Sequence, residues 1–240
     1  MPRIVWLSGN SGSGKTFAGD GLALLAGFHH MDGDELFFSS DPEDRALFGK
    51  LIEAFGFWFE GRPAPRALWE PYYARQCARV RAALAAGHAD VAISLTVYHR
   101  ETRDYLRAQL PEHTYVLLRC SPAELIRRAR VRFAEYARSR EQSVEECWLA
   151  SHKTAYSESE FTRQTLDVMR GLQPIEADEK GCFEVDVTEG RPFDALFPLL
   201  GLGSAPEAVP VEEIAAVNYK RFDAAAARGK EAEAARAGGT

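Results

Sequence analysis

The stretch Leu7–Asp20, LSGNSGSGKTFAGD, decides the fold, because its small residues and its Gly-Lys-Thr separate two segments of different periodicity. Before it, residues 3–8 form a nearly continuous apolar run, which is typical of a strand buried on both faces. After Gly14 apolar residues recur at helical spacing as far as Gly27, a natural helix end. The sequence therefore predicts a strand, a glycine-rich loop and a helix in succession.

The loop Gly9–Thr16 matches the Walker A pattern G-x-x-x-x-G-K-[ST] at every fixed position. Small residues let successive backbone N–H groups turn around phosphate oxygens, and the helix N-terminus adds positive potential. The flanking strand and helix disfavour a plain glycine-rich turn. We expect Lys15 to reach the β- and γ-phosphates of ATP and Thr16 to ligate Mg²⁺. The residues predicted to bind the nucleotide are Gly9, Asn10, Ser11, Gly12, Ser13, Gly14, Lys15 and Thr16.

The acidic segment Asp32–Glu35 follows a second predicted strand, FHHMD, at residues 28–32. Taken alone, the segment is equally well explained as a solvated turn, in which Asp and Gly are common. In open α/β sheets, however, ligands lie beyond the carboxyl ends of the strands, where the first loop already places its phosphates. One carboxylate could hold a Mg²⁺-bound water, while the other orients an acceptor hydroxyl or takes its proton.

Three further apolar runs indicate buried strands, and helical segments separate all five strands along the chain. These runs are DVAISLT at residues 90–96, TYVLLR at 114–119 and CFEVDV at 182–187. The alternation predicts an α/β fold with a mainly parallel sheet covered on both faces. Residues 41–86, broken by EGRPAPR at 60–66, are expected to form a helical insert.

Arginines are concentrated on a helix predicted to begin at Ser121–Glu124, where Ser and Glu have the spacing of a capping box. A second box, Ser143–Glu146, opens another helical region. Arg128 and Arg132 are spaced i and i+4 and so share a helix face. The alternative is a solvated charged face. As part of a mobile lid at about residues 127–145, these guanidinium groups would stabilise the transferring phosphoryl group.

The composition is that of a globular protein, with 46% hydrophobic and 27% charged residues among 240. The formal net charge of -6 argues against binding to nucleic acid or to an anionic membrane surface. No apolar run is long enough to span a membrane, and the N-terminus lacks a signal-peptide pattern, so we expect a cytoplasmic protein. The four widely spaced cysteines suggest no zinc site, and a homodimer is left open.

We expect the neighbours of the acidic segment to be mainly structural. His29 and His30 are expected to form hydrogen bonds in a strand rather than to bind a metal. The nearby aromatic residues are expected to pack mainly in the core, with some lining an acceptor pocket. They are Phe37, Phe38, Phe55, Phe57, Trp58 and Phe59. After a domain at residues 1–202, residues 203–240 are predicted to form a linker and a helical tail, either marginal or docked.

These segments resemble the small P-loop kinases of the gluconate kinase and shikimate kinase group, which are related to nucleoside monophosphate kinases. The resemblance covers roughly residues 3–200: LSGNSGSGKT resembles the gluconate kinase phosphate loop, and DGDEL combines motifs of both kinases. ISLTVYHRETRDYLR is similar to a gluconate kinase segment, and Arg128 and Arg132 stand at the paired lid positions. The resemblance implies a P-loop NTPase fold with a five-stranded parallel sheet, Mg-ATP as donor, a polyhydroxylated acceptor, and Asp34 at that acceptor.

The chain also departs from this group. Phe37 replaces the histidine of the gluconate kinase loop, residues 134–136 replace its Gly-His-Phe, and SLTVY replaces the shikimate kinase glycines. The long insert at residues 41–86 predicts a reshaped or enlarged acceptor pocket. Ser94 and Thr96 occupy the end of the third strand, where motor and switch ATPases place a Mg²⁺-binding aspartate, which disfavours those classes.

The sequence thus predicts an ATP-dependent phosphotransferase that acts on an alcohol group of a small metabolite, such as a sugar acid or polyol. The predicted catalytic residues are Lys15, Asp34, Arg128 and Arg132, and the predicted Mg²⁺ ligands are Thr16 and Asp32. A nucleoside or nucleotide kinase is the alternative enzyme, because the insert and its aromatic residues could hold a base. A catalytically inactive nucleotide-binding regulatory protein, which reaches a partner through its tail, is the alternative from another class.

Overall fold

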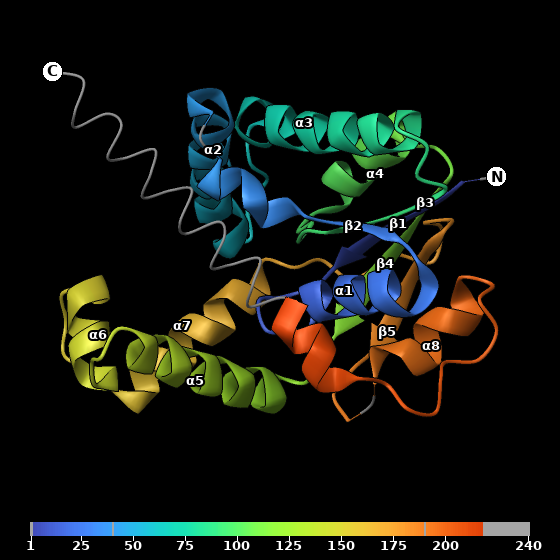
Figure 1. Cartoon of the computed structure of the whole chain (residues 1–240). Helices are drawn as coiled ribbons and strands as arrows, with labels where there is room; N and C mark the ends of the chain where they lie inside the picture. Colours follow the sequence, from blue (N-terminus) through green and yellow to red (C-terminus); the bar gives the residue numbers. More distant parts are fainter. Residues whose placement is uncertain (1, 40, 190, 218–240) are drawn as a thin grey trace, which may run out of the picture.

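A five-stranded, all-parallel sheet forms the centre of the protein, with helices on both faces (Figure 1). The structure is a computed structural model that describes residues 2–39, 41–189 and 191–217. The strands are β1 Arg3–Ser8, β2 His29–Asp32, β3 Asp90–Ser94, β4 His113–Arg119 and β5 Cys182–Asp186, in the order β2-β3-β1-β4-β5. The predicted α/β fold class is therefore confirmed.

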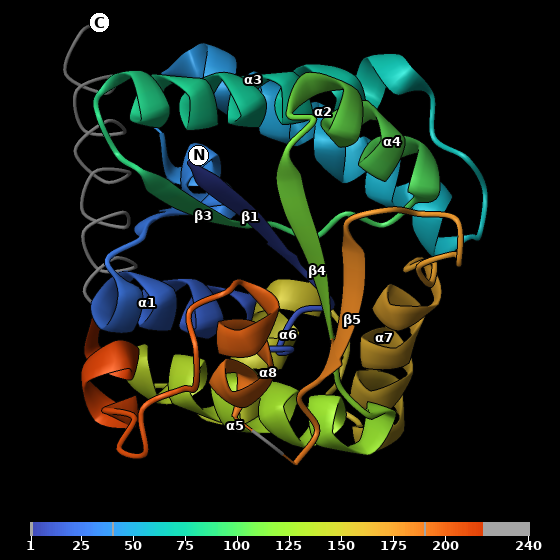
Figure 2. The same ribbon diagram turned by 90° about the vertical axis from the view of Figure 1, so that its right-hand side faces the viewer.

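Helices α2, α3 and α4 cover one face of the sheet, and α1 and α8 cover the other (Figures 1 and 2). Helices α5, α6 and α7 form a separate group at one end of the molecule. The bounds are α1 Lys15–Ala26, η1 Gly33–Phe38 (a 3-10 helix), α2 Pro42–Phe59, α3 Arg66–Ala85, α4 Arg100–Gln109, α5 Pro122–Ser139, α6 Val144–His152, α7 Glu158–Arg170 and α8 Pro192–Leu199. No helix in the described ranges is long and apolar enough to cross a membrane.

Strand β1 is buried on both faces because its side chains alternate between two cores. Ile4 and Trp6 pack into a core with the side of the sheet covered by α2 and α3. Val5 and Leu7 pack into the opposite core, which includes Phe193 of α8. This double burial explains why the strand is read in the sequence as a continuous apolar run.

The strand order brings the ends of three strands together. In the parallel register Leu7 of β1 pairs with Ser94 of β3, and Asp32 of β2 pairs with the same Ser94. The loop that follows β1 and the acidic segment that follows β2 therefore leave the same edge of the sheet. This edge is where open α/β sheets bind their ligands.

The insert is helical in two pieces, as predicted, and its aromatic side chains mostly pack in the core. Trp58 is 1% exposed, and the ring of Phe55 lies 5.9 Å from it and 5.3 Å from that of Tyr98. Phe37 is 48% exposed and packs on Phe48. The side chain of residue 38 lies outside the described residues.

The two predicted capping boxes have different outcomes. Ser143 and Glu146 form a complete box at the start of α6, each side chain bonded to the backbone N–H of the other. At the start of α5 the Ser121 hydroxyl accepts from the N–H of Glu124, but the prediction of a full box is wrong. The N–H of Ser121 instead donates to the Thr188 hydroxyl at 2.9 Å, and the Glu124 carboxylate binds two arginines of α5.

The C-terminal segment contributes to the second core before the described residues end. Residues 211–217 are helical, and Ile214 is fully buried among the side chains that cover α1 and α8. Val211 and Val217 are exposed. The rest of the predicted tail, residues 218–240, lies outside the described residues, so the division at residue 202 stays a prediction.

A buried ion pair fastens the segment between α7 and β5 onto α4. Two Arg103 nitrogens donate to the two Glu179 carboxylate oxygens at 2.7 Å, and these side chains are 1% and 0% exposed. Arg103 also donates to the carbonyls of Gln173 and Pro174. The guanidinium group is thus satisfied by a segment that is 70 or more residues away in sequence.

We expect Glu179→Gln to lower the free energy of unfolding by about 3 to 5 kcal/mol, because it leaves a buried guanidinium without its counterion. Burial alone would raise the pKa of Glu179, but the hydrogen bonds from Arg103 outweigh it, and the pKa is lowered. The ion pair therefore stabilises the fold fully at pH values above about 4.3, the ordinary pKa of a glutamate. This stabilisation is lost as the pH falls through the lower pKa that Glu179 has in the folded protein. Urea unfolding at neutral and acidic pH measures both effects.

The matched control is Glu176→Gln, because Glu176 pairs with Arg100 at the exposed edge of the same segment. Exposed ion pairs contribute about 0 to 1 kcal/mol, so this variant should unfold nearly as wild type does. Equal effects of the two substitutions would contradict the role assigned to the buried pair.

Candidate active site

The loop between β1 and α1 requires glycine at three positions. Gly9, Gly12 and Gly14 have φ values of 143°, 85° and 90°, in the region that residues with a Cβ rarely adopt. A Cβ at Gly9 would also lie 2.5 Å from the carbonyl oxygen of Leu118 and 2.6 Å from the Ser13 hydroxyl. The loop therefore wraps closely against the end of the sheet, and its backbone leads directly into the N-terminus of α1.

Lys15, the first residue of α1, reaches back across this loop. Its ammonium group donates to the carbonyl of Asn10 at 3.0 Å. The surrounding protein desolvates the ammonium and lowers its pKa, while Asp34 and Asp32 oppose this effect and Arg132 adds to it. The lysine thus lies within electrostatic range of two carboxylates and one arginine.

Thr16 and Asp32 offer the oxygen atoms that Mg²⁺ prefers. The Thr16 hydroxyl donates to one Asp32 carboxylate oxygen at 3.0 Å, and Asp32 is 3% exposed. The other carboxylate oxygen accepts from the N–H of Asp34 at 3.0 Å and caps η1. A hydroxyl and a carboxylate beside the predicted nucleotide-binding loop fit Mg²⁺, which usually takes one or two protein oxygens and completes its shell with phosphates and water.

Asp34 stands at the start of η1 with its side chain exposed on one side. The protein atoms packed around the rest of the side chain remove enough water to raise its pKa, and the neighbouring Asp32 raises it further. Lys15 and Arg132 oppose this rise. The predicted catalytic residues Lys15, Asp34 and Arg132 are therefore brought together with the predicted metal ligand Asp32.

The two predicted lid arginines have different surroundings. Arg128 donates to the carbonyl of Gly12 at 3.3 Å, to the carbonyl of Val187 at 2.9 Å and to Glu124 at 2.7 Å. Arg132, one turn further along α5, is exposed and has no hydrogen bond or ion pair with any residue in the described ranges. Arg128 is thus held against the loop backbone, whereas Arg132 keeps its donors available beside Lys15 and Asp34.

A cavity of about 340 Å³ lies beside the loop where Arg128 is anchored. Its walls are the end of the loop, the segment after β5 and the start of α8. The lining residues are Gly12, Ser13, Gly14, Phe17, Arg128, Val187, Arg191, Pro192, Phe193, Val209 and Val211. The cavity is therefore mainly apolar, with the guanidinium groups of Arg128 and Arg191 in its wall.

Helix α3 holds the acidic segment in place, which the sequence analysis did not predict. The hydroxyl of Tyr72 and the amide of Gln76 both donate to the Gly33 carbonyl, at 2.6 and 2.9 Å. Arg79 donates to the Glu35 carboxylate at 2.8 Å. The signal in the sequence was the spacing of these three polar residues, which places them on one face of a helix in an otherwise buried region.

The hydrogen bonds predicted for the strand histidines are found for His30, whereas the contact that the structure shows for His29 is a ring stacking. The ring of His30 lies between the carboxylate of Asp20 at 2.8 Å and the hydroxyl of Ser94 at 3.0 Å. His29 stacks on His88, with the ring centres 4.0 Å apart. The His30 network ties α1 to β2 and β3 directly behind the loop.

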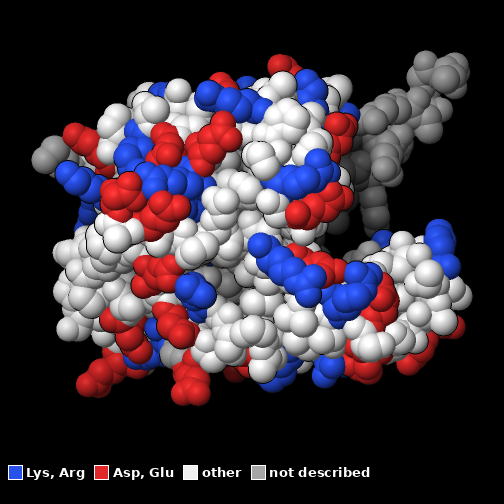
Figure 3. All heavy atoms as spheres, turned by 180° about the vertical axis from the view of Figure 1, so that it is seen from behind, with Lys and Arg blue, Asp and Glu red and all other residues white. Residues whose placement is uncertain are grey.

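The surface between the helical groups is hollowed and carries mixed charge. Figure 3 shows an indentation between the part that contains α2 and α3 and the part that contains α5, α6 and α7. On this face Lys and Arg side chains are interspersed with Asp and Glu rather than gathered into one basic patch.

No protein-family profile matches the chain, and no curated protein matches it. Among solved structures it is similar to a gluconokinase from Sinorhizobium meliloti 1021, with 20% identity, a TM-score of 0.48 and coverage of 92% of this chain and 97% of that chain. It is also similar to a sugar kinase from Janibacter sp. HTCC2649, with 20% identity, a TM-score of 0.49 and coverage of 85% of this chain and 96% of that chain. A shikimate kinase from Acinetobacter baumannii is 16% identical, with a TM-score of 0.38 and coverage of 84% of this chain and 92% of that chain. All three are small P-loop kinases, the group that the sequence motifs resemble.

Proposed function

We propose that the chain is an ATP-dependent kinase that transfers the γ-phosphate to a hydroxyl group of a small molecule. The observation that supports this most is the cluster of Lys15, Asp34 and Arg132: Lys15 reaches across the loop to Asn10, Asp34 stands in the first turn of η1, and Arg132 is exposed on α5. These groups are close enough for Lys15 and Asp34 to shift each other's pKa and for Arg132 to oppose the raised pKa of Asp34. A protein that only binds nucleotide needs the loop, but it does not need a second carboxylate beside the lysine and an arginine that no described residue binds. The cluster therefore favours transfer over binding alone.

In this proposal the loop N–H groups and Lys15 hold the phosphates of ATP, and Thr16 and Asp32 hold Mg²⁺. Bound Mg²⁺ supplies positive charge that offsets the charge on the β- and γ-phosphates. Asp34 orients the acceptor hydroxyl and takes its proton as the new oxygen–phosphorus bond forms and ADP leaves. Arg132 stabilises the negative charge on the transferring group.

The nucleotide base has a separate place in this arrangement. The mainly apolar cavity beside Arg128 adjoins the loop at Gly12 and Gly14, next to the backbone that would hold the phosphates. A planar guanidinium stacks well on aromatic rings, and Arg128 is already fixed by two backbone carbonyls. We therefore assign Arg128 to the base end of ATP, in place of the catalytic role that the sequence predicts for it, and Arg132 to the γ-phosphate end.

Thr16→Val should raise the Mg²⁺ concentration that gives half-maximal phosphate transfer by about tenfold or more, because a hydroxyl beside a charged group contributes about 1.5 to 3 kcal/mol. Valine keeps the shape of threonine and removes only the oxygen. A magnesium titration at fixed ATP measures the shift. Thr154→Val, at an exposed position, is the control. An unchanged midpoint in Thr16→Val would exclude Thr16 as a Mg²⁺ ligand.

The acceptor class is tested by a panel that contains sugar acids, polyols, nucleosides and nucleoside monophosphates. The sequence favours sugar acids or polyols, and the alternative is a nucleoside or nucleotide kinase. ATP consumption above that of Lys15→Ala identifies the accepted class. If ATP were consumed only with nucleosides or nucleoside monophosphates, the protein would be a nucleoside or nucleotide kinase instead.

A further inference from the structure

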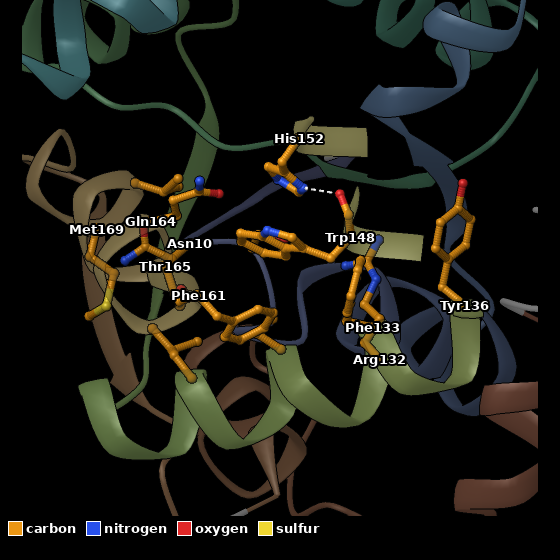
Figure 4. Close-up of a pocket in the computed structure, with 15 residues that line it drawn as sticks. Asn10, Arg132, Phe133, Tyr136, Trp148, His152, Phe161, Gln164, Thr165 and Met169 are labelled. Carbon is orange, nitrogen blue, oxygen red and sulfur yellow. Dashed lines mark hydrogen bonds between the residues drawn. The ribbon is translucent and has the colours of Figure 1, made fainter. Parts of the chain in front are cut away.

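A second, larger cavity lies between the phosphate loop and helices α5, α6 and α7 (Figure 4). Its volume of about 440 Å³ is within the range of small-molecule sites, whereas about 150 Å³ is enough to hold benzene. Three loop residues, five residues of α5, two of α6 and five of α7 line it. The apolar members are Leu125, Ala129, Phe133, Trp148, Phe161, Val168 and Met169.

Trp148 forms the aromatic wall of this cavity and has an unsatisfied donor. Its side chain is 2% exposed and lies in the middle of the lining residues, stacked on His152 with ring centres 3.8 Å apart. The ring centres of Phe133 and Phe161 lie 6.0 and 5.9 Å from that of Trp148. The indole N–H has no partner in the part of the chain that the structure describes, although buried tryptophans usually have one.

The cavity opens onto the phosphate loop at Asn10. The side-chain oxygen of Asn10 is buried and also has no partner within the described ranges. The backbone carbonyl of the same residue accepts from Lys15, and Arg132 lines the cavity next to it. A molecule in the cavity would therefore lie next to the groups assigned to the transferring phosphate.

The polar side chains of the cavity do not all face a ligand with free groups. The Gln164 amide donates to Glu160 and the Thr165 hydroxyl donates to the Phe161 carbonyl. Ser11 and Arg132 line the cavity together with Asn10, and Tyr136 and His152 complete the polar lining. The apolar walls around Trp148, with one indole donor among them, match a flat ring, and the polar groups at the phosphate loop match one or two oxygens on it. A polyol would lose part of its hydration against the apolar walls.

We propose that this cavity receives the body of the phosphate acceptor and that the acceptor is an aromatic alcohol of about two rings. The inference rests on the proposed kinase function and specifies the substrate class of that site. The ring lies against Trp148, and the hydroxyl lies at the Asn10 end. Its oxygen forms the bond to the γ-phosphorus, the bond from that phosphorus to the β–γ bridging oxygen breaks, and the proton goes to Asp34.

The test uses 2-(2-naphthyl)ethanol as the probe and gluconate as the comparison. Binding to the full chain with ADP and Mg²⁺ is measured by calorimetry, and phosphate transfer from ATP is measured separately. Ala129→Leu fills the cavity from α5 without removing a polar group, and it should weaken naphthylethanol binding at least tenfold. Ala123→Leu, at an exposed position of the same helix, should leave binding unchanged. Thermal unfolding checks that both variants fold.

A second variant separates the indole donor from the packing. Trp148→Phe keeps a ring in the wall and removes the N–H, so it should weaken binding severalfold while leaving the KM for ATP unchanged. Naphthylethanol binding that Ala129→Leu does not affect, or no binding to the wild type, would overturn the cavity assignment. Transfer to gluconate that is insensitive to Ala129→Leu would overturn the aromatic acceptor and leave the kinase proposal intact. Cavity-dependent binding without transfer to any alcohol would overturn the kinase proposal instead.

Discussion

Lys15→Ala is expected to reduce phosphate transfer by roughly 10³-fold, because it removes a fixed positive charge from the transferring phosphate. The Lys15 ammonium lies across the loop, bonded to Asn10, and its lowered pKa reflects desolvation by the packed loop. In such surroundings a charge acts more strongly on a phosphate than it would in water. Steady-state transfer at saturating Mg-ATP measures the loss.

The control for this variant is Lys50→Ala, because Lys50 is exposed on α2, away from the loop. It should transfer phosphate at the wild-type rate. Lys15→Ala should also fold normally, since the side chain makes one hydrogen bond to a backbone carbonyl and fills no core position. Wild-type turnover in a folded Lys15→Ala variant would mean that the loop does not carry the reaction.

Asp34→Asn should reduce the transfer rate by about 10²- to 10⁴-fold, with ATP binding largely kept. The asparagine has the same shape, so η1 keeps its cap, in which the N–H of residue 34 donates to Asp32. What is lost is the carboxylate that orients the acceptor and takes its proton. Single-turnover transfer and equilibrium ATP binding, measured on the same sample, separate the two properties.

Asp41→Asn is the matched control, because it makes the same substitution at the start of another helix, where the Asp41 side chain caps α2. It should have little effect on transfer. If Asp34→Asn transferred phosphate as fast as the wild type, the acceptor role of Asp34 would be wrong, and the proton would have to leave by another route.

The fold was predictable because its signals are local. Residues 3–8 alternate between two cores, so the buried strand appears as one apolar run. The box at Ser143–Glu146 forms as expected because both partners lie within one turn. The box at Ser121 is incomplete because Thr188, which is 67 residues away, supplies the competing acceptor. Sequence spacing cannot reveal such a partner.

In the candidate site, too, local patterns identify some residues, and others depend on how distant segments pack. The loop pattern and the acidic segment identify Lys15, Thr16, Asp32 and Asp34, because parallel strand ends meet at one edge. The support from Tyr72 depends on where α3 packs, which local periodicity does not determine. The cavity beside Trp148 arises from three helices that meet only in the folded chain.

The most direct test of the central claim follows radiolabelled γ-phosphate from ATP to small alcohols, with Lys15→Ala as the blank. The panel contains polyols, sugar acids, nucleosides and aromatic alcohols, and labelled products are separated from ATP and inorganic phosphate. The account predicts a labelled acceptor with the wild type and none above the blank with Lys15→Ala. Tight ATP binding by the wild type without any labelled acceptor would contradict it and would favour a nucleotide-binding regulatory protein.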